Sequence, residues 1–168
     1  MALRQIRENG DPILTKKSKE VKEMTPRIKE LLDDMWDTLH DAQGVGLAAV
    51  QVGILKRIFI VEISDDEQYT FINPVIISSD GEQTGYEGCL SVPGKVGEVT
   101  RPEHVIIEAL DEKMEPVRIE GHELLARAMC HEFDHLEGRI YIDLVEGELY
   151  DADNVPEDDE DDLQEETE

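Results

Sequence analysis

The amino-acid sequence predicts an α+β fold built mostly from antiparallel β-sheets. Three features carry this prediction: an amphipathic helical pattern near the start, a middle of short β-branched runs divided by Gly, Pro, Asp and Ser, and a second helical pattern near the end. Strands that follow one another without intervening helices favour antiparallel pairing over alternating β–α–β units. A length of 168 residues suits a single domain with its own hydrophobic core.

The first helix is predicted over residues 25–44. Thr25 can cap its start, Pro26 suits the first helical position, and Gly44 marks the expected end. Apolar residues recur at helical spacing and form one stripe: Ile28, Leu31, Leu32, Met35 and Leu39. We expect this stripe to pack on the core, with the helix on the outside of the sheets.

Four runs in the middle of the chain predict strands. They cover residues 57–63, 69–77, 104–110 and 115–121, and they are rich in β-branched residues. The stretch GYEGCLSVPG, residues 85–94, is rich in Gly and Pro and is interpreted as tight turns that hold Cys89 at a fixed angle.

A second helix is predicted over residues 121–138, ending near Gly138, and its natural packing is against the concave face of the strands. It carries the motif His131-Glu132-x-x-His135. Residues i and i+4 share one helix face, so the two imidazoles can bind one metal ion while Glu132 stays free as a base.

A catalytic site of this kind needs a third protein ligand. Tyr141 stands where an extended motif would place a third histidine, and Cys130 is rotated about 100° away from His131 on the helix. Cys89 is a candidate third ligand, with a buried inert cysteine as the alternative. The other histidines, His40, His104 and His122, are expected to stand alone on the surface or in the core.

The charge of the chain is strongly negative. The formal net charge of −25 argues against binding nucleic acid or an anionic membrane through a general basic face. No signal peptide is recognisable, and no apolar run approaches the roughly 18 residues that span a bilayer, which indicates a cytoplasmic protein with reduced thiols. Residues 151–168 hold 11 acidic and no basic residues, so we expect a domain over residues 1–150 followed by a disordered acidic tail.

The stretch QGVGLAAVQVG, residues 43–53, contains one strongly polar side chain between its glycines, that of Gln51. A primary amide can donate a hydrogen bond to a developing oxyanion. A structural glutamine in a glycine-rich turn is the alternative interpretation.

Together, the stretches GVGLAAVQ, EGCLS and HEFDHLEG occur in the order of the three signature motifs of the peptide deformylases, and the chain resembles that family from DPIL near the start to about Leu144. The resemblance implies a metal helix in the middle of the sheets. It implies one divalent metal ion on Cys89, His131 and His135, namely Fe²⁺ in the cell, with Ni²⁺, Co²⁺ or Zn²⁺ in preparations.

The resemblance also implies the reaction, which is hydrolysis of the N-formyl group from the initiator methionine of new polypeptides with release of formate. A water activated by the metal attacks the formyl carbon, and Glu132 acts as general base and then acid. The oxyanion is held by the metal, the Gln51 amide and the Leu90 backbone N–H.

Substrate-binding residues follow from the same resemblance and from the glycine-rich stretch. They are Gly44, Val45, Gly46, Tyr86, Gly88, Leu124, Arg127 and Ala128, with Met129 as a further candidate. Arg127 either lines the pocket mouth with its charge in water or is a plain solvated helix residue. Arg101 either reaches a peptide carbonyl of the substrate or is an exposed loop arginine.

The expected partners are N-formyl-methionyl nascent peptides and, transiently, the ribosome, with no membrane and no specific nucleic acid. Some relatives dock through a basic C-terminal segment, but this acidic C-terminus would be repelled by ribosomal RNA, so the docking mode stays unassigned. Two alternatives are an H-E-x-x-H metallopeptidase that cleaves internal peptide bonds and a catalytically inactive binding protein with the same fold.

Overall fold

The computed structural model describes residues 2–155, which form two antiparallel sheets and two main helices. None of the helices among these residues is long and apolar enough to cross a membrane. The helices and strands are α1 (Pro26–Ala42), β1 (Gly46–Ala48), β2 (Ile58–Ser64), β3 (Glu67–Asp80), β4 (Gln83–Cys89), β5 (Val92–Arg101), β6 (His104–Leu110), β7 (Pro116–His122), α2 (Glu123–Leu136) and β8 (Glu146–Asp151), with short 3₁₀ helices at Pro12–Thr15, Ala49–Val52, Tyr141–Leu144 and Ala152–Asn154.

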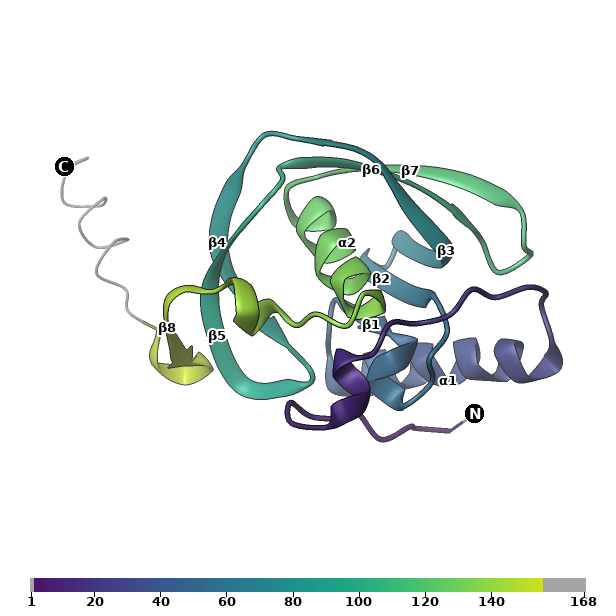
Figure 1. The fold of residues 1–168 in the computed structure, drawn as a ribbon, viewed down its shortest axis with the longest axis horizontal. Coiled ribbons are helices and arrows are strands. Elements are labelled where there is room, and N and C mark those ends of the chain that lie inside the picture. Colours follow the sequence, from purple (N-terminus) through teal and green to yellow (C-terminus); the bar gives the residue numbers. More distant parts are fainter. Residues whose placement is uncertain (1, 156–168) are drawn as a thin grey trace.

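The larger sheet has the strand order β1-β2-β3-β6-β7, and the smaller sheet has the order β4-β5-β8. Every pair of neighbouring strands within them is antiparallel, which confirms the predicted α+β class. Figure 1 shows α2 in the middle of the molecule with strands of both sheets around it, and α1 at the edge. Because α2 is enclosed in this way, side chains on several of its faces are buried.

The four predicted strands exist, and both helices lie close to their predicted bounds. The Thr25 hydroxyl accepts a hydrogen bond from the Ile28 N–H at 3.2 Å, as an N-cap does. α1 ends at Ala42, two residues before the expected glycine, because Gln43 adopts the left-handed cap conformation. After α2, Gly138 has a φ of +78°, and a Cβ there would lie 2.4 Å from the Thr15 carbonyl oxygen. Glycine is therefore required where this helix ends.

The first four residues of β2, Ile58 to Val61, are all apolar and all buried. Ile58 and Ile60 pack in the core cluster that α1 covers, whereas Phe59 and Val61 pack in the cluster around α2. Successive side chains of a strand point to opposite faces, so a helix on each face buries all four of these residues. Phe59 also stacks on its cross-strand partner Phe71, with ring centroids 4.4 Å apart.

The prediction of tight turns at Gly85 and Gly88 is wrong. Both glycines lie inside β4, and the turn falls at residues 90–91, between Cys89 at the end of β4 and Val92 at the start of β5. Glycine has low strand propensity, so its sequence pattern did not indicate the strand. β1, β5 and β8 were not predicted either.

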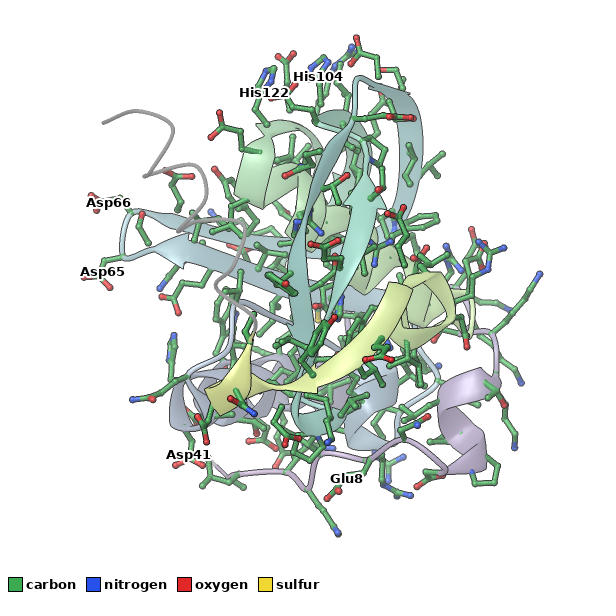
Figure 2. All side chains as sticks on the ribbon, turned by 90° about the vertical axis from the view of Figure 1, so that its left-hand side faces the viewer. Glu8, Asp41, Asp65, Asp66, His104 and His122 are labelled. Atoms are coloured by element: carbon green, nitrogen blue, oxygen red, sulfur yellow. The ribbon has the colours of Figure 1, made fainter. Side chains whose placement is uncertain are left out.

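The acidic segment expected to be disordered begins within described structure. Asp151 belongs to β8 and forms an ion pair with Lys95 of β5, and a 3₁₀ helix follows at Ala152–Asn154. The rest of the segment, residues 156–168, lies outside the described residues. On the described surface, acidic side chains project at well-separated places, such as Glu8, Asp41 and Asp65 (Figure 2).

Candidate metal centre and active site

The third and fourth turns of α2 and the end of β4 bring three metal-binding side chains together. One donor atom each of Cys89, His131 and His135 lies within 4.8 Å of the others. The Cys89 Sγ is 3.3 Å from the His135 Nε2. The spacing of four residues places the two histidines on one helix face, and the β4 end supplies the thiol from the opposite side.

This donor set fits a divalent transition metal. One thiolate and two imidazoles are ligands that iron, cobalt, nickel and zinc accept. Burial lowers the pKa of His135 well below its usual value, so its ring is neutral and offers a lone pair. The other cysteine, Cys130, packs in the apolar core beside α2, as predicted, and burial raises the pKa of its thiol to about 11. Tyr141 is buried and stacks on the His131 ring, so it is no substitute ligand.

Glu132 is a buried carboxylate next to this set. Its Oε2 is 3.7 Å from the His131 Nε2, and its Oε1 has no hydrogen-bond partner among the described residues. Burial raises the pKa of Glu132 to about 7, so the group can both take up and release a proton near neutral pH. A Cβ on Gly46 would lie 2.7 Å from the Glu132 Oε2, which shows how closely β1 covers this carboxylate.

Gln51 is 1% exposed and lies in the 3₁₀ helix that follows β1. Its Oε1 accepts a hydrogen bond from the Ala48 N–H at 2.9 Å, which fixes the orientation of the amide. Its Nε2 then points at the Ser91 hydroxyl (3.1 Å) and at the Cys89 Sγ (3.5 Å). The amide donor is thus held beside the candidate metal ligand rather than in a remote turn.

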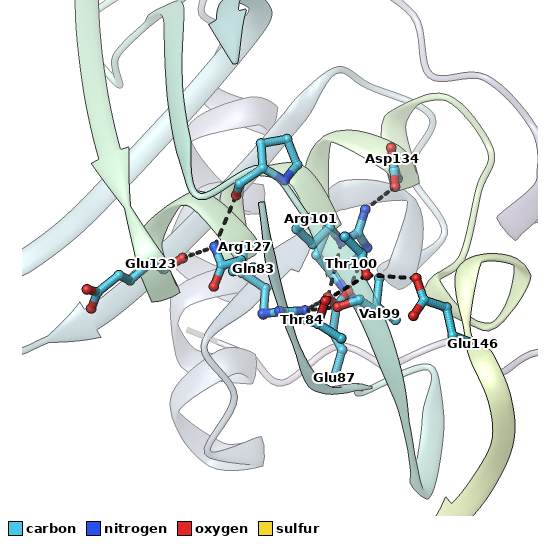
Figure 3. A network of polar contacts seen from close by, with 12 residues as sticks. Gln83, Thr84, Glu87, Val99, Thr100, Arg101, Glu123, Arg127, Asp134 and Glu146 are labelled. Carbon is cyan, nitrogen blue, oxygen red and sulfur yellow. Dashed lines mark hydrogen bonds and ion pairs between the residues drawn. The ribbon is translucent and has the colours of Figure 1, made fainter. Parts of the chain in front are cut away.

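Glu87 is a site residue that sequence reasoning missed. It lies on β4, is buried, and accepts hydrogen bonds from the Nδ1 of His131 and from Arg101 (2.6 and 3.1 Å) and Arg127 (2.7 Å). Figure 3 shows Glu87 between the two arginines. Because an ionised carboxylate only accepts, the His131 Nδ1 carries a proton, which leaves Nε2 as the ring nitrogen available to a metal ion.

The charge of Glu87 is stabilised by these donors. Burial alone would raise the pKa of Glu87, but hydrogen bonds from His131 and Arg101 outweigh it and hold the pKa far below its usual range. One feature of the sequence could have indicated a buried acidic partner such as Glu87. Arg127 is a cation inside the apolar stretch 124–130, and a cation that is buried requires a buried counter-charge.

The expected surroundings of the two arginines need correction, although Arg127 does line the cavity beside Cys89. Arg127 is buried, and its guanidinium donates to Glu87 and to the Val99 carbonyl rather than to water. Arg101 is buried at the end of β5 and is neither an exposed loop residue nor free to reach a substrate, because Glu87 and Asp134 occupy its donors. Tertiary pairing, which the sequence does not display, decided both positions.

A cavity of about 510 Å³ opens beside the metal-binding set. Cys89, His131 and Glu132 line it, and so does Leu90. The structure also brings every residue predicted to bind substrate to its wall: Gly44, Val45, Gly46, Tyr86, Gly88, Leu124, Arg127 and Ala128. Met129 does not line it and packs fully buried in the core instead.

Comparisons with known proteins agree on one family. A family model described as polypeptide deformylase matches residues 3–149. A peptide deformylase of Lachnoclostridium phytofermentans is 54% identical over 162 residues, 95% of this chain and 99% of that protein. One from Agathobacter rectalis is 58% identical over 90% of this chain and 96% of its own length. The crystal structure of a peptide deformylase from Legionella pneumophila aligns with a TM-score of 0.84 and 41% identity, covering 86% of this chain and 87% of that chain.

Proposed function

Because the chain belongs to the polypeptide deformylase family, a family of metal-dependent hydrolases that remove the N-formyl group from nascent peptides, we propose how its residues divide that task. The observation that carries the proposal is the meeting of one thiol and two imidazoles within 4.8 Å, next to a buried carboxylate and an open cavity.

In this proposal Cys89, His131 and His135 hold the metal, which is Fe²⁺ in the cell. Preparations with Ni²⁺, Co²⁺ or Zn²⁺ are expected to be loaded at the same three residues, because the donor set suits all of these ions. When bound, the ion supplies Lewis-acid polarisation of a water and of the formyl oxygen. Glu87 accepts the proton of the His131 Nδ1 and so fixes the ring in the orientation in which Nε2 would hold the ion.

Glu132 carries the proton that is transferred in the proposed reaction. Its carboxylate lies at the cavity wall beside His131 and takes a proton from the attacking water. The same group then gives this proton to the amine that leaves. Enclosure by β1 and α2 keeps bulk water away from the carboxylate, which is why its pKa is high enough for the second step.

Gln51 and Leu90 stabilise the negative charge that develops on the formyl oxygen. The Gln51 amide is fixed by the Ala48 N–H and presents its Nε2 beside Cys89, and Leu90 lies in the turn directly after Cys89. Each such donor is typically worth about 3 kcal/mol in the transition state.

The cavity walls bind the formyl-methionyl end of the peptide. Leu124, Ala128 and Tyr86 offer apolar surface to the methionine side chain, and residues 44–46 border the reacting end next to Glu132. A narrow wall there favours a formyl group, whose carbon carries only hydrogen, over larger acyl groups. We place the enzyme in the cytoplasm, where it meets ribosome-bound nascent chains.

Formate release from a formyl-methionyl tripeptide, measured after anaerobic loading with iron or nickel, tests the proposal. We expect Glu132→Ala to retain metal and to lose turnover. The control is Glu137→Ala, which removes a carboxylate that ends the same helix and pairs with Arg57. Full activity of Glu132→Ala would refute the assignment of the base.

Metal analysis tests the ligand set separately. Cys89→Ser is expected to lose bound metal, while Cys130→Ser, the same change at the buried cysteine of the core, keeps it. Unchanged metal content and turnover in Cys89→Ser would overturn the ligand assignment. Release of internal peptide fragments without formate would instead support a metallopeptidase.

A further inference from the structure

Two histidines that do not line the cavity form a second cluster. His104 and His122 are partners across the antiparallel pair β6–β7, and their rings stack with centroids 4.4 Å apart and planes 12° from parallel. Figure 2 shows both at one end of the molecule. The expectation that these histidines stand alone is therefore wrong, because strand register joined positions 18 residues apart in sequence.

Three carboxylates surround the stacked rings. Asp80 lies 2.6 Å from the Nδ1 of His104, and Glu103 lies 3.2 Å from the Nδ1 of His122. Glu120 lies 2.6 Å from the other nitrogen of His104, its Nε2. Each ring thus has its own carboxylate partner at Nδ1, and a third carboxylate faces Nε2 of one ring.

This arrangement orients both rings as metal ligands are oriented. A carboxylate can only accept, so Asp80 and Glu103 hold a proton on Nδ1 and leave Nε2 of each ring to carry a lone pair or a second proton. Carboxylate–histidine pairs of this kind fix the tautomer of metal-ligating histidines and raise their basicity.

We propose that His104, His122 and Glu120 form a surface site for a divalent transition-metal ion of the zinc type. One ring nitrogen of each histidine and one Glu120 oxygen lie within 4.8 Å of one another. Two imidazoles and a carboxylate are a donor set found in three-ligand zinc sites, and imidazole selects such ions over Mg²⁺ or Ca²⁺, which prefer oxygen. The ion replaces the proton that His104 shares with Glu120.

The position of the cluster suggests what an ion would do there. Asp80 ends β3 before the chain enters the smaller sheet, Glu103 lies between β5 and β6 where it returns, and His122 ends β7 before α2. Gln83 already links these segments by donating to the Pro102 and Glu123 carbonyls at 3.0 and 2.7 Å (Figure 3). A bound ion would instead cross-link β6 and β7 of the larger sheet at the ends that adjoin these connections, and it would stabilise the folded state by mass action.

The test counts Zn²⁺ bound to the full chain whose cavity site is already loaded with nickel, by equilibrium dialysis with nickel measured in the same samples. We expect the protein to bind one equivalent of zinc more than the amount of nickel that it loses. The double variant His104→Gln/His122→Gln should lose that equivalent, and His40→Gln, a change at a surface histidine outside the cluster, should keep it. Equal zinc binding by the double variant and the unchanged protein, or no excess zinc at all, would overturn the proposal.

Two further measurements separate a built site from weak surface binding. Asp80→Asn/Glu103→Gln keeps all three proposed ligands and should weaken zinc binding by about 10- to 100-fold, as loss of orienting partners does. An unchanged affinity would contradict the orientation that the proposal rests on. Formate release should be the same in all these variants, since none of the residues lines the cavity, and circular dichroism would verify that each variant folds.

Discussion

Glu87 is a buried carboxylate that receives hydrogen bonds from His131, Arg101 and Arg127. These three donors come from β5 and α2, while Glu87 itself comes from β4. One side chain therefore joins the smaller sheet to the metal helix and fixes a candidate metal ligand at the same time. Removing one partner of such a group leaves uncompensated charges without water.

We predict that Glu87→Gln lowers the free energy of unfolding by about 3–5 kcal/mol at neutral pH, because the buried guanidinium of Arg127 loses its counter-charge and that of Arg101 keeps only Asp134. Glu108→Gln is the matched control, since Glu108 pairs with Arg118 at 3.6 Å on the exposed surface. In Glu108→Gln the free energy of unfolding should fall by only about 0–1 kcal/mol. Urea unfolding with a chelator present throughout measures both, and equal losses in the two variants would contradict the prediction.

We also predict that the difference in stability between the unchanged protein and Glu87→Gln depends on pH. The folded-state pKa of Glu87 lies below its ordinary value of 4.5, so its stabilisation is fully present above that pH and is lost as the pH falls through the folded value. The advantage of the unchanged protein over Glu87→Gln should therefore shrink as the pH drops below 4.5. An advantage that stays constant down to strongly acidic pH would show that Glu87 is not ionised in the folded protein.

At the scale of secondary-structure elements, the close approach of β1 to α2 encloses the proposed base. Gly46 lies so near α2 that a Cβ would come within 2.7 Å of the Glu132 Oε2 and 2.9 Å of its Cγ. The short strand β1 thus covers one side of the Glu132 carboxylate. The absence of a side chain at this position is what leaves room for Glu132 in its observed place.

Gly46→Ala should displace Glu132 and lower kcat by about 100-fold, as an error of about 1 Å in a reacting group does. Bound metal should be retained, because the three atoms nearest to the added methyl group all belong to Glu132, which is not one of the proposed ligands. Gly85→Ala is the control: its Cβ would meet the Arg127 Nη2 at 3.4 Å, an ordinary contact. A kcat of Gly46→Ala equal to that of Gly85→Ala would show that Glu132 tolerates displacement or is not the base.

At the scale of the whole molecule, the charge of −25 is spread over a small protein and repels itself. Added NaCl screens such repulsion over a Debye length of about 8 Å at 0.15 M salt. Salt also weakens attractive ion pairs, which lowers stability. The sign of the salt effect on stability therefore shows whether repulsion or attraction dominates.

We predict that the melting temperature rises with added NaCl and rises less in a chain ended after Val155, which lacks nine acidic residues. The shortened chain should keep its formate release, because β8 and its contact with β5 remain. A melting temperature that falls with salt would mean that attractive pairs outweigh net repulsion. A large loss of activity in the shortened chain would show that residues 156–168 contribute to folding or catalysis.

Sequence patterns were informative where a property repeats at short range. Helical spacing located α1 and the pair His131 and His135, and β-branched runs located four strands. The three motifs in order indicated the family. Patterns failed at β4 and β5, because glycine and proline weaken the strand signal although tertiary pairing forms a strand there.

By itself, the sequence determined the fold class, the family and the residues that meet at the proposed metal site, since helix periodicity and motif order are local properties of the chain. Only the tertiary structure decided the surroundings of those residues. It buried Arg101 and Arg127 around Glu87, closed β1 over Glu132, and stacked His104 on His122. Each of these depends on strand register and on the packing of α2 between two sheets, and long-range contacts of this kind leave no periodic trace in the sequence.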